Sequence, residues 1–247
     1  MFIDLHHHLV HGVDDGAQDF EAAGRLLLRA GQDGIRHLIA TPHMVPGQEE
    51  FPMEKYLSHL EMARAFCREK GLDLQLYSGA EILYTRDTPR LLQEGKALTL
   101  AGSPFVLVEF SPDDAFAHLR EAAQRISGAG FIPVFAHIER YACLQKWQHV
   151  LELKQQFSVR CQVNGRTVIH RQGFFRRRQM DRLLENGLVD YIATDAHDMP
   201  GRGACMTQAF EALSQVWGEE YARRLTCLNA LEILPGAAGE RKTEENQ

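Results

Sequence analysis

The chain has 247 residues, of which 45% are hydrophobic and 24% are charged, and its formal net charge is −6. This size and composition are ordinary for a globular protein with one large domain or two small ones. The acidic balance argues against a nucleic-acid or anionic-membrane partner, and no apolar run of about 18 residues predicts a transmembrane helix.

Short apolar runs rich in β-branched residues alternate with amphipathic segments along the chain. The runs recur about every 30 residues, which is typical of strands separated by crossover helices. Seven strands are therefore predicted, at residues 2–5, 37–40, 74–78, 105–109, 132–136, 159–163 and 191–193.

Helical patterns occupy the intervals between these strands. The first begins near Asp19, a suitable N-cap, and places Leu26, Leu27 and Ala30 on one face. The others cover roughly residues 54–70, 115–128, 146–157, 178–186 and 207–217. This alternation predicts a parallel α/β sheet with right-handed crossovers. A closed or distorted barrel and an open doubly wound sheet fit the pattern equally, and no linker-like stretch divides the chain in two.

Polar residues stand at or just after the end of each predicted strand. The active sites of α/β barrels and open α/β sheets lie at the carboxyl ends of their strands. We therefore expect these residues to form a ring around one mouth. In chain order they are Asp4 with His6, His7 and His8; His43; Glu81; Glu109; His137 with Glu139 and Arg140; Asn164; and Asp195 with His197.

The histidine triplet that follows Leu5 has a specific geometric consequence. Side chains alternate between the faces of a strand, so His6 and His8 point the same way and His7 points the other way. An H-x-H pair of this kind presents two imidazoles to one metal ion. Asp195 and His197 repeat the same spacing on the last strand, and His7 is expected to be a packed core residue.

In these strand-end motifs, the sequence resembles the polymerase-and-histidinol-phosphatase (PHP) metal-dependent phosphoesterases. Among them it is most similar to the bacterial manganese-dependent protein-tyrosine phosphatases of capsular and exopolysaccharide synthesis. The resemblance spans roughly residues 2–235. It rests on the segments DLHHHLVHGVDDG, GIRHLIATPHMVPG, YSGAEILYT, VLVEFS, PVFAHIERY, QVN and YIATDAHD with a following GR.

The resemblance implies a distorted (β/α)7 barrel of the PHP type with its active site at the C-terminal ends of the strands. A single catalytic domain would cover residues 1–235, and residues 236–247 would form a polar tail. Up to three divalent metals would be bound. Manganese is implied by the resemblance, while nitrogen and carboxylate ligands also suit iron, zinc or magnesium. The matching ligands are His6, His8, Asp15, His43, Glu81, Glu109, His137, Asp195 and His197.

The resemblance also suggests how these ligands divide among the metals. One metal would be held by His6, His8, Glu81 and Asp195; a second would share Glu81 and add Glu109 and His137; a third would take Asp15, His43 and His197. Asp15 is preferred to Asp14 because it directly precedes Gly16.

The expected reaction is hydrolysis of phosphotyrosine by a metal-activated hydroxide. Fixed positive charge must then stabilise the transferred phosphoryl group, and Arg140 and Arg202 are the candidates. The expected substrate is a tyrosine autokinase that controls polysaccharide synthesis or export. In this branch a histidine or a basic residue often follows the position of His43, where Met44 stands here, so substrate preference would differ while metal binding would not.

Three alternatives remain open at this point. The chain could be a small-molecule phosphatase of the same superfamily, for example for histidinol phosphate. A metal-dependent amidohydrolase or deacetylase is a second possibility, although no lysine at a strand end suits carbamylation. A non-enzymatic binding module is a third possibility. It is disfavoured because each of the nine ligand positions holds a residue that can bind metal.

Cysteine-based phosphatase chemistry is excluded, because no cysteine has an arginine six positions later. The five scattered cysteines predict a reducing cytoplasm.

Overall fold

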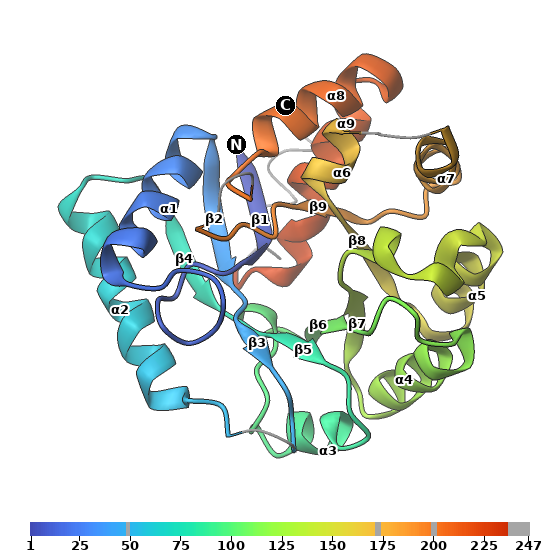
Figure 1. The fold of residues 1–247 in the computed structure, drawn as a ribbon, viewed down its shortest axis with the longest axis horizontal. Helices are drawn as coiled ribbons and strands as arrows, with labels where there is room; N and C mark the ends of the chain where they lie inside the picture. The colour runs from blue at the N-terminus through green and yellow to red at the C-terminus, as the bar shows by residue number, and fades with distance from the viewer. Residues whose placement is uncertain (48–49, 171–173, 199–201, 237–247) are drawn as a thin grey trace.

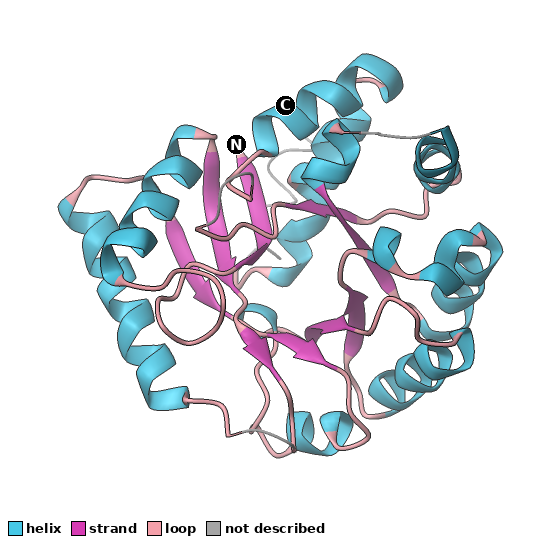
Figure 2. Cartoon of the chain, viewed as in Figure 1, coloured by secondary structure: helices cyan, strands magenta, loops and turns pink. Residues whose placement is uncertain are grey.

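Parallel strands form a ring at the centre of the molecule, and helices surround it (Figure 1, Figure 2). The computed structural model describes residues 1–47, 50–170, 174–198 and 202–236. Its strands are β1 Phe2–His7, β2 Ile35–Ala40, β3 His43–Met44, β4 Gln75–Ser78, β5 Glu81–Leu83, β6 Phe105–Glu109, β7 Ile132–Phe135, β8 Arg160–Asn164 and β9 Tyr191–Ala193.

The ring follows the order of the chain. β2 pairs with β4 and β3 pairs with β5, so β2/β3 and β4/β5 are two long strands, each interrupted by two residues. β5 to β9 then pair in sequence, and a bridge between His7 and Ala196 joins the end of β9 to β1. All these pairings are parallel. The seven predicted strands are thus present, and the expected α/β barrel, not an open doubly wound sheet, is confirmed.

The helices cover the outside of this ring (Figure 2). The six predicted ones are present within a few residues of their expected bounds, and Asp19 caps the first by accepting the Ala22 N–H. Three shorter helices, α3, α6 and α9, were not predicted, because so few turns give little periodicity to detect. The bounds are α1 Phe20–Gln32, α2 Met53–Glu69, α3 Thr88–Gln93, α4 Phe116–Gly128, α5 Trp147–Phe157, α6 Gly165–Ile169, α7 Phe174–Glu185, α8 Met206–Trp217 and α9 Glu219–Thr226.

Strand alternation builds two apolar layers. On β6, Val106 and Val108 join the large cluster that packs against the helices, whereas Phe105 and Leu107 join the smaller cluster inside the ring. Glu109 is the next residue of the inward-facing row, so the strand that fills the interior also ends in a carboxylate at the mouth.

The five cysteines are all free, and four of them are buried. Among the described residues, no helix is long and apolar enough to cross a membrane. Of the predicted tail 236–247, only Gly236 lies inside the described residues.

Asp33, directly after α1, caps a helix that begins far along the chain. Its carboxylate accepts the Met206 N–H at 2.5 Å and the Thr207 N–H at 3.1 Å, the first N–H groups of α8. We expect Asp33→Ala to lower the free energy of unfolding by about 1–2 kcal/mol, because these N–H groups lose their acceptor. Urea denaturation measures this loss. Asp73→Ala, which removes only an exposed ion pair with Arg36, is the control, and equal losses in both variants would contradict the capping role.

Candidate metal centre

A β-bulge in β1 lets His6 and His8 face the mouth while His7 faces outward. Asp4 pairs with Leu38 and His7 pairs with Ala40, so three steps along β1 oppose two along β2. Leu38 and Ala40 belong to the outer cluster, which places Asp4 and His7 on the outward side. The extra residue leaves the His6 N–H out of register, and the Asp4 carboxylate accepts it.

His7 is a packed core residue, as expected. Its side chain is fully buried, and neither ring nitrogen has a hydrogen-bond partner among the described residues. Burial and the neighbouring His8 and His197 lower the pKa of His7 to about 3, so its imidazole is neutral.

Glu81, the first residue of β5, lies among four imidazoles. One of its oxygens, Oε2, is 3.0 Å from His6 Nε2, 3.2 Å from His8 Nε2 and 3.2 Å from His43 Nδ1. The other, Oε1, is 2.7 Å from His137 Nε2. Burial alone would raise the pKa of Glu81, but these imidazoles outweigh it and hold the pKa well below its usual range.

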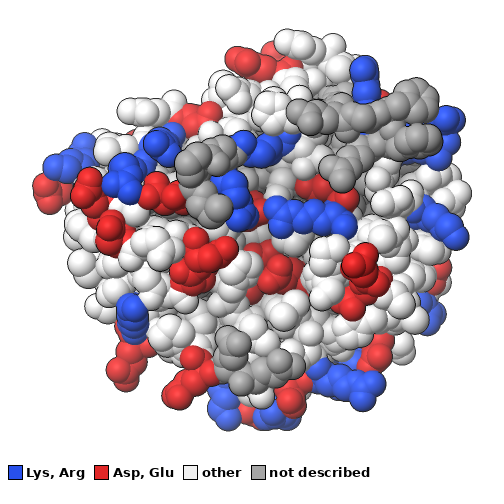
Figure 3. Space-filling model, in the orientation of Figure 1, with Lys and Arg blue, Asp and Glu red and all other residues white. Residues whose placement is uncertain are grey.

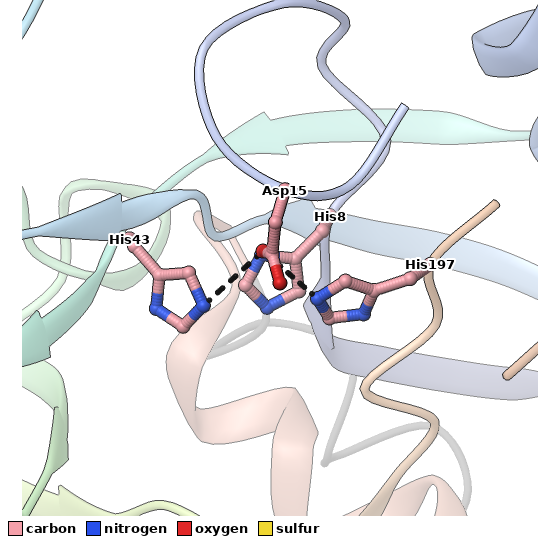
Figure 4. Close-up of side chains that lie close together, drawn as sticks. All are labelled: His8, Asp15, His43 and His197. Carbon is pink, nitrogen blue, oxygen red and sulfur yellow. Dashed lines mark ion pairs between the residues drawn. The ribbon is translucent and has the colours of Figure 1, made fainter. Parts of the chain in front are cut away.

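A second cluster of side chains that can bind metal lies around Asp15. Asp15 Oδ1 is 3.4 Å from His43 Nε2 and 3.3 Å from His197 Nε2, and His8 stacks on His197 with 4.0 Å between ring centroids (Figure 4). Glu109 Oε1 lies 3.0 Å from His43 Nδ1 and connects the cluster to β6.

Asp195 and the two predicted arginines form the third part of the centre. Arg140 Nη2 donates to Asp195 Oδ2 at 2.6 Å, and Arg202 Nη2 donates to Asp195 Oδ1 at 2.9 Å. The same Oδ1 lies 3.6 Å from both His6 Nε2 and His8 Nε2. Burial raises the pKa of Asp195, but His6 and the arginine charge outweigh it and lower the pKa below its usual range.

Two residues of the centre adopt the left-handed backbone region that side chains other than glycine rarely occupy. His137 has φ 31° and Asp195 has φ 50°. Such conformations cost of order 1–3 kcal/mol each and persist where the surrounding structure holds them. Each residue lies two positions beyond the end of a strand, β7 or β9, and its side chain contacts the other residues of the centre.

The pKa values of two imidazoles, His6 and His43, reflect the neighbouring carboxylates. Burial lowers the pKa of His6, but Glu81 and Asp195 outweigh it and raise the pKa to about 9. For His43, burial is likewise outweighed, by Glu109 and Glu81, and its pKa also rises to about 9. The site therefore favours positive charge between its carboxylates.

The donor set fits divalent metal ions. His6 Nε2 and His8 Nε2 face each other at 3.2 Å while both face the same Glu81 oxygen. His197 Nε2 is buried and makes no hydrogen bond within the described part of the chain. The donors are imidazole nitrogens and carboxylate oxygens without thiolates, which suits manganese, iron, zinc or magnesium.

All nine predicted ligands lie in this one centre. The donor atoms that approach one another within 4.8 Å form four overlapping groups among the described residues: His8, Asp15, His43 and His197; His6, His8 and Glu81; His6, His137 and Asp195; and His43, Glu81 and Glu109. His6, His8, His43 and Glu81 each belong to two of these groups, so the division of ligands among individual metals stays a prediction.

The structure separates the two aspartates of VDDG. The Asp15 side chain is 60% exposed and faces two imidazoles, whereas the Asp14 side chain is 3% exposed and lies behind His8. Asp14 Oδ2 is 2.6 Å from His8 Nδ1 and also accepts the His43 N–H, so it fixes the orientation of the His8 ring. The position of Asp14 in VDDG does not indicate this role, which depends on a contact with His8, directly after β1.

Tyr141 is a second residue that supports a predicted ligand, and no motif in the sequence indicates this role. Its hydroxyl accepts the Phe110 N–H at 3.2 Å and lies 3.4 Å from His137 Nδ1. Met44, which follows His43, is 4% exposed and its side chain packs in the outer apolar layer; the expected effect on substrate preference stays a prediction.

The surface around the centre carries both signs of charge. Figure 3 shows Asp and Glu side chains at the middle of this face with Lys and Arg side chains beside them. The Arg140 and Arg202 side chains are 44% and 31% exposed, so solvent reaches both guanidinium groups.

Comparison with known proteins agrees with this geometry. Residues 2–235 match the family model described as capsular polysaccharide synthesis, CpsB/CapC. The tyrosine-protein phosphatase CpsB of Streptococcus pneumoniae is 30% identical over 237 residues, which cover 94% of this chain and 98% of the relative. The tyrosine-protein phosphatase YwqE of Bacillus subtilis is 25% identical, over 91% of this chain and 88% of the relative.

A solved structure gives the same picture of the fold. It comes from the crystal structures of YwqE from Bacillus subtilis and CpsB from Streptococcus pneumoniae, described as unique metal-dependent tyrosine phosphatases. It superimposes with a TM-score of 0.85 over 94% of each chain, at 24% identity.

Proposed function

The chain belongs to the CpsB/CapC family of capsular polysaccharide synthesis, and on this premise we propose that it is a metal-dependent tyrosine-protein phosphatase. Its substrate would be phosphotyrosine on a bacterial tyrosine autokinase that controls polysaccharide synthesis or export, in the cytoplasm. The observation that carries the proposal is the convergence of imidazoles and carboxylates on one mouth, with two arginines beside them.

We propose that the centre binds up to three divalent metals, with manganese as the physiological ion. The nine residues named above would hold them, and Glu81 would be central to the set because its two oxygens face four imidazoles. Such metals lower the pKa of a bound water and clamp phosphoryl oxygens.

The two arginines would recognise the phosphoryl group. Arg140 and Arg202 approach Asp195 from two sides and remain partly exposed, so their remaining N–H groups can donate to a phosphate at the mouth. Arginine donates to phosphate in a planar, bidentate geometry, and preorganised donors stabilise charge that develops in the transition state.

A substrate panel with metal-depleted protein tests this function. We expect the depleted protein to lose nearly all activity and added Mn²⁺ to restore it, because the water nucleophile depends on the metal. With Mn²⁺, a phosphotyrosine peptide should be hydrolysed with a higher kcat/KM than a phosphoserine peptide or histidinol phosphate.

Two outcomes would contradict the proposal. Activity that is unaffected by metal depletion would exclude the metal mechanism. Preference for histidinol phosphate would support the small-molecule alternative, and comparable turnover of all three substrates would exclude tyrosine specificity.

A further inference from the structure

Strand β8 supplies none of the nine predicted ligands, yet two of its side chains contact three of them. Gln162 and Asn164 are two residues apart and therefore point to the same face of the strand. Gln162 is fully buried and Asn164 is 6% exposed. Gln162 contacts His6 and His137, and Asn164 contacts Asp195.

The hydrogen bonds of Gln162 have only one possible direction. The backbone N–H of His137 donates to the side-chain oxygen Oε1 of Gln162 at 2.7 Å, so that atom is an acceptor. His6 Nδ1 lies 3.3 Å from the same oxygen. Because an amide oxygen cannot donate, His6 Nδ1 must carry the hydrogen.

This hydrogen on Nδ1 decides which ring nitrogen of His6 can bind a metal. Metal binding requires the neutral imidazole, in which only one nitrogen carries a hydrogen, so Nε2 is then the ligand atom. His6 Nε2 is the atom that faces Glu81 Oε2 at 3.0 Å and His8 Nε2 at 3.2 Å. Gln162 thus selects the tautomer of His6 that can bind a metal at this position.

Asn164 extends the same chain of hydrogen bonds to Asp195. Gln162 Nε2 donates to Asn164 Oδ1 at 2.8 Å, and Asn164 Nδ2 donates to Asp195 Oδ2 at 2.8 Å. The side-chain amide of Gln162 therefore orients the side-chain amide of Asn164. The donor from Asn164 occupies Oδ2 and leaves Oδ1 of Asp195 directed toward His6 and His8.

We propose that Gln162 is a positioning residue that fixes His6 as its Nδ1–H tautomer and, through Asn164, orients Asp195 for metal binding. This inference rests on the metal-dependent function proposed above. It assigns a role in metal affinity to a strand that holds no ligand. A purely structural Gln162 would matter for folding stability but not for the tautomer of His6 or for metal affinity.

The test uses the full chain loaded with Zn²⁺, a diamagnetic probe. Long-range ¹H–¹⁵N spectra should show the His6 hydrogen on Nδ1 in the unsubstituted protein. Calorimetric titration of metal-depleted protein should show that Gln162→Leu binds Zn²⁺ about 10–100-fold more weakly, as is typical when a partner of a metal ligand is removed. Gln162→Glu keeps an acceptor at His6 Nδ1 and should recover most of this affinity and the Nδ1–H signal.

Gln156→Leu is the matched control, because Gln156 is an exposed residue of α5 that contacts Arg120. The proposal is overturned if His6 carries its hydrogen on Nε2 in the unsubstituted protein, or if Gln162→Leu binds Zn²⁺ as tightly as the control. If thermal unfolding shows that Gln162→Leu does not fold, Gln162→Glu decides: loss of the Nδ1–H signal in that variant also overturns the proposal.

The outcome is separable from that of the phosphatase proposal. Mn²⁺-dependent hydrolysis of phosphotyrosine together with an Nε2–H His6 overturns only the role of Gln162. An Nδ1–H His6 and weakened Zn²⁺ binding in Gln162→Leu, without phosphotyrosine hydrolysis by the unsubstituted protein, overturns only the proposed reaction.

Discussion

Glu81→Gln is expected to lower kcat/KM for a phosphotyrosine peptide by about 10³-fold or more, a loss of roughly 4 kcal/mol of transition-state stabilisation. Glu81 is 1% exposed, and its two oxygens face four imidazole nitrogens at 2.7–3.2 Å. The glutamine side chain would have nearly the same shape as that of Glu81, but it lacks the negative charge. Its amide would also point two N–H donors toward the imidazole nitrogens that should face a metal ion. The centre therefore loses the carboxylate that its clusters share.

Steady-state kinetics and elemental analysis of the purified variant check this expectation together. Metal content should fall with activity, because the charge that holds the ions is gone. Glu121→Gln on α4 is the control, since that side chain is 41% exposed and pairs only with surface arginines in the contacts described. A Glu81→Gln enzyme with normal metal content and normal rate would contradict the assignment of this carboxylate as a shared ligand.

Arg140→Ala and Arg202→Ala are each expected to lower kcat by about 10²–10³-fold, the usual effect of removing one preorganised donor to a transition-state oxygen. Both guanidinium groups touch Asp195 and are partly exposed at the mouth. Metal content should stay at the unsubstituted level, because neither arginine is a ligand.

The metal measurement separates substrate recognition from a supporting role. If the arginines served only to hold Asp195, metal content would fall in parallel with activity, and the proposed contact with phosphate would be wrong. The Lys variants at the two positions should retain part of the rate, since a point charge replaces a bidentate donor. Arg86→Ala, at a side chain that is 82% exposed, is the control.

Local patterns in the sequence were sufficient for the alternation of parallel strands and helices and for the residue types at the strand ends, whereas the choice of a barrel over an open sheet came from the family resemblance. Strand β6 is an example: the apolar run that begins at Phe105 predicted the strand, and Glu109 at its end was predicted to lie at the mouth, but only the structure shows that Phe105 and Leu107 face the interior. Period-2 and period-3.6 patterns reflect which side of an element is buried, so they can be detected without any knowledge of the partners. The resemblance to a known family then connected the strand-end residues to metal chemistry.

The bulge in β1 was decided only by the tertiary structure. Simple alternation from Ile3 and Leu5, which lie in the interior, would direct His7 inward. The register of Asp4 and His7 against β2 instead adds one residue, so His6 and His8 face the mouth and His7 faces outward. A bulge depends on how two strands pair, and Asp4 stabilises it by accepting hydrogen bonds from both His6 and Thr194, which is 190 residues away.

The same distinction applies to the residues that support the ligands. The motif VDDG indicated a carboxylate ligand, but only the structure shows that Asp15 faces the imidazoles and Asp14 lies behind His8. Gln162 is separated from His6 by 156 positions, and no local pattern distinguishes it from any other polar residue of a strand. The sequence by itself determined which side chains could bind metal, because that depends on residue type and strand position. Tertiary packing decided which atoms of those side chains are free to bind, because that depends on hydrogen bonds between strands far apart in the chain.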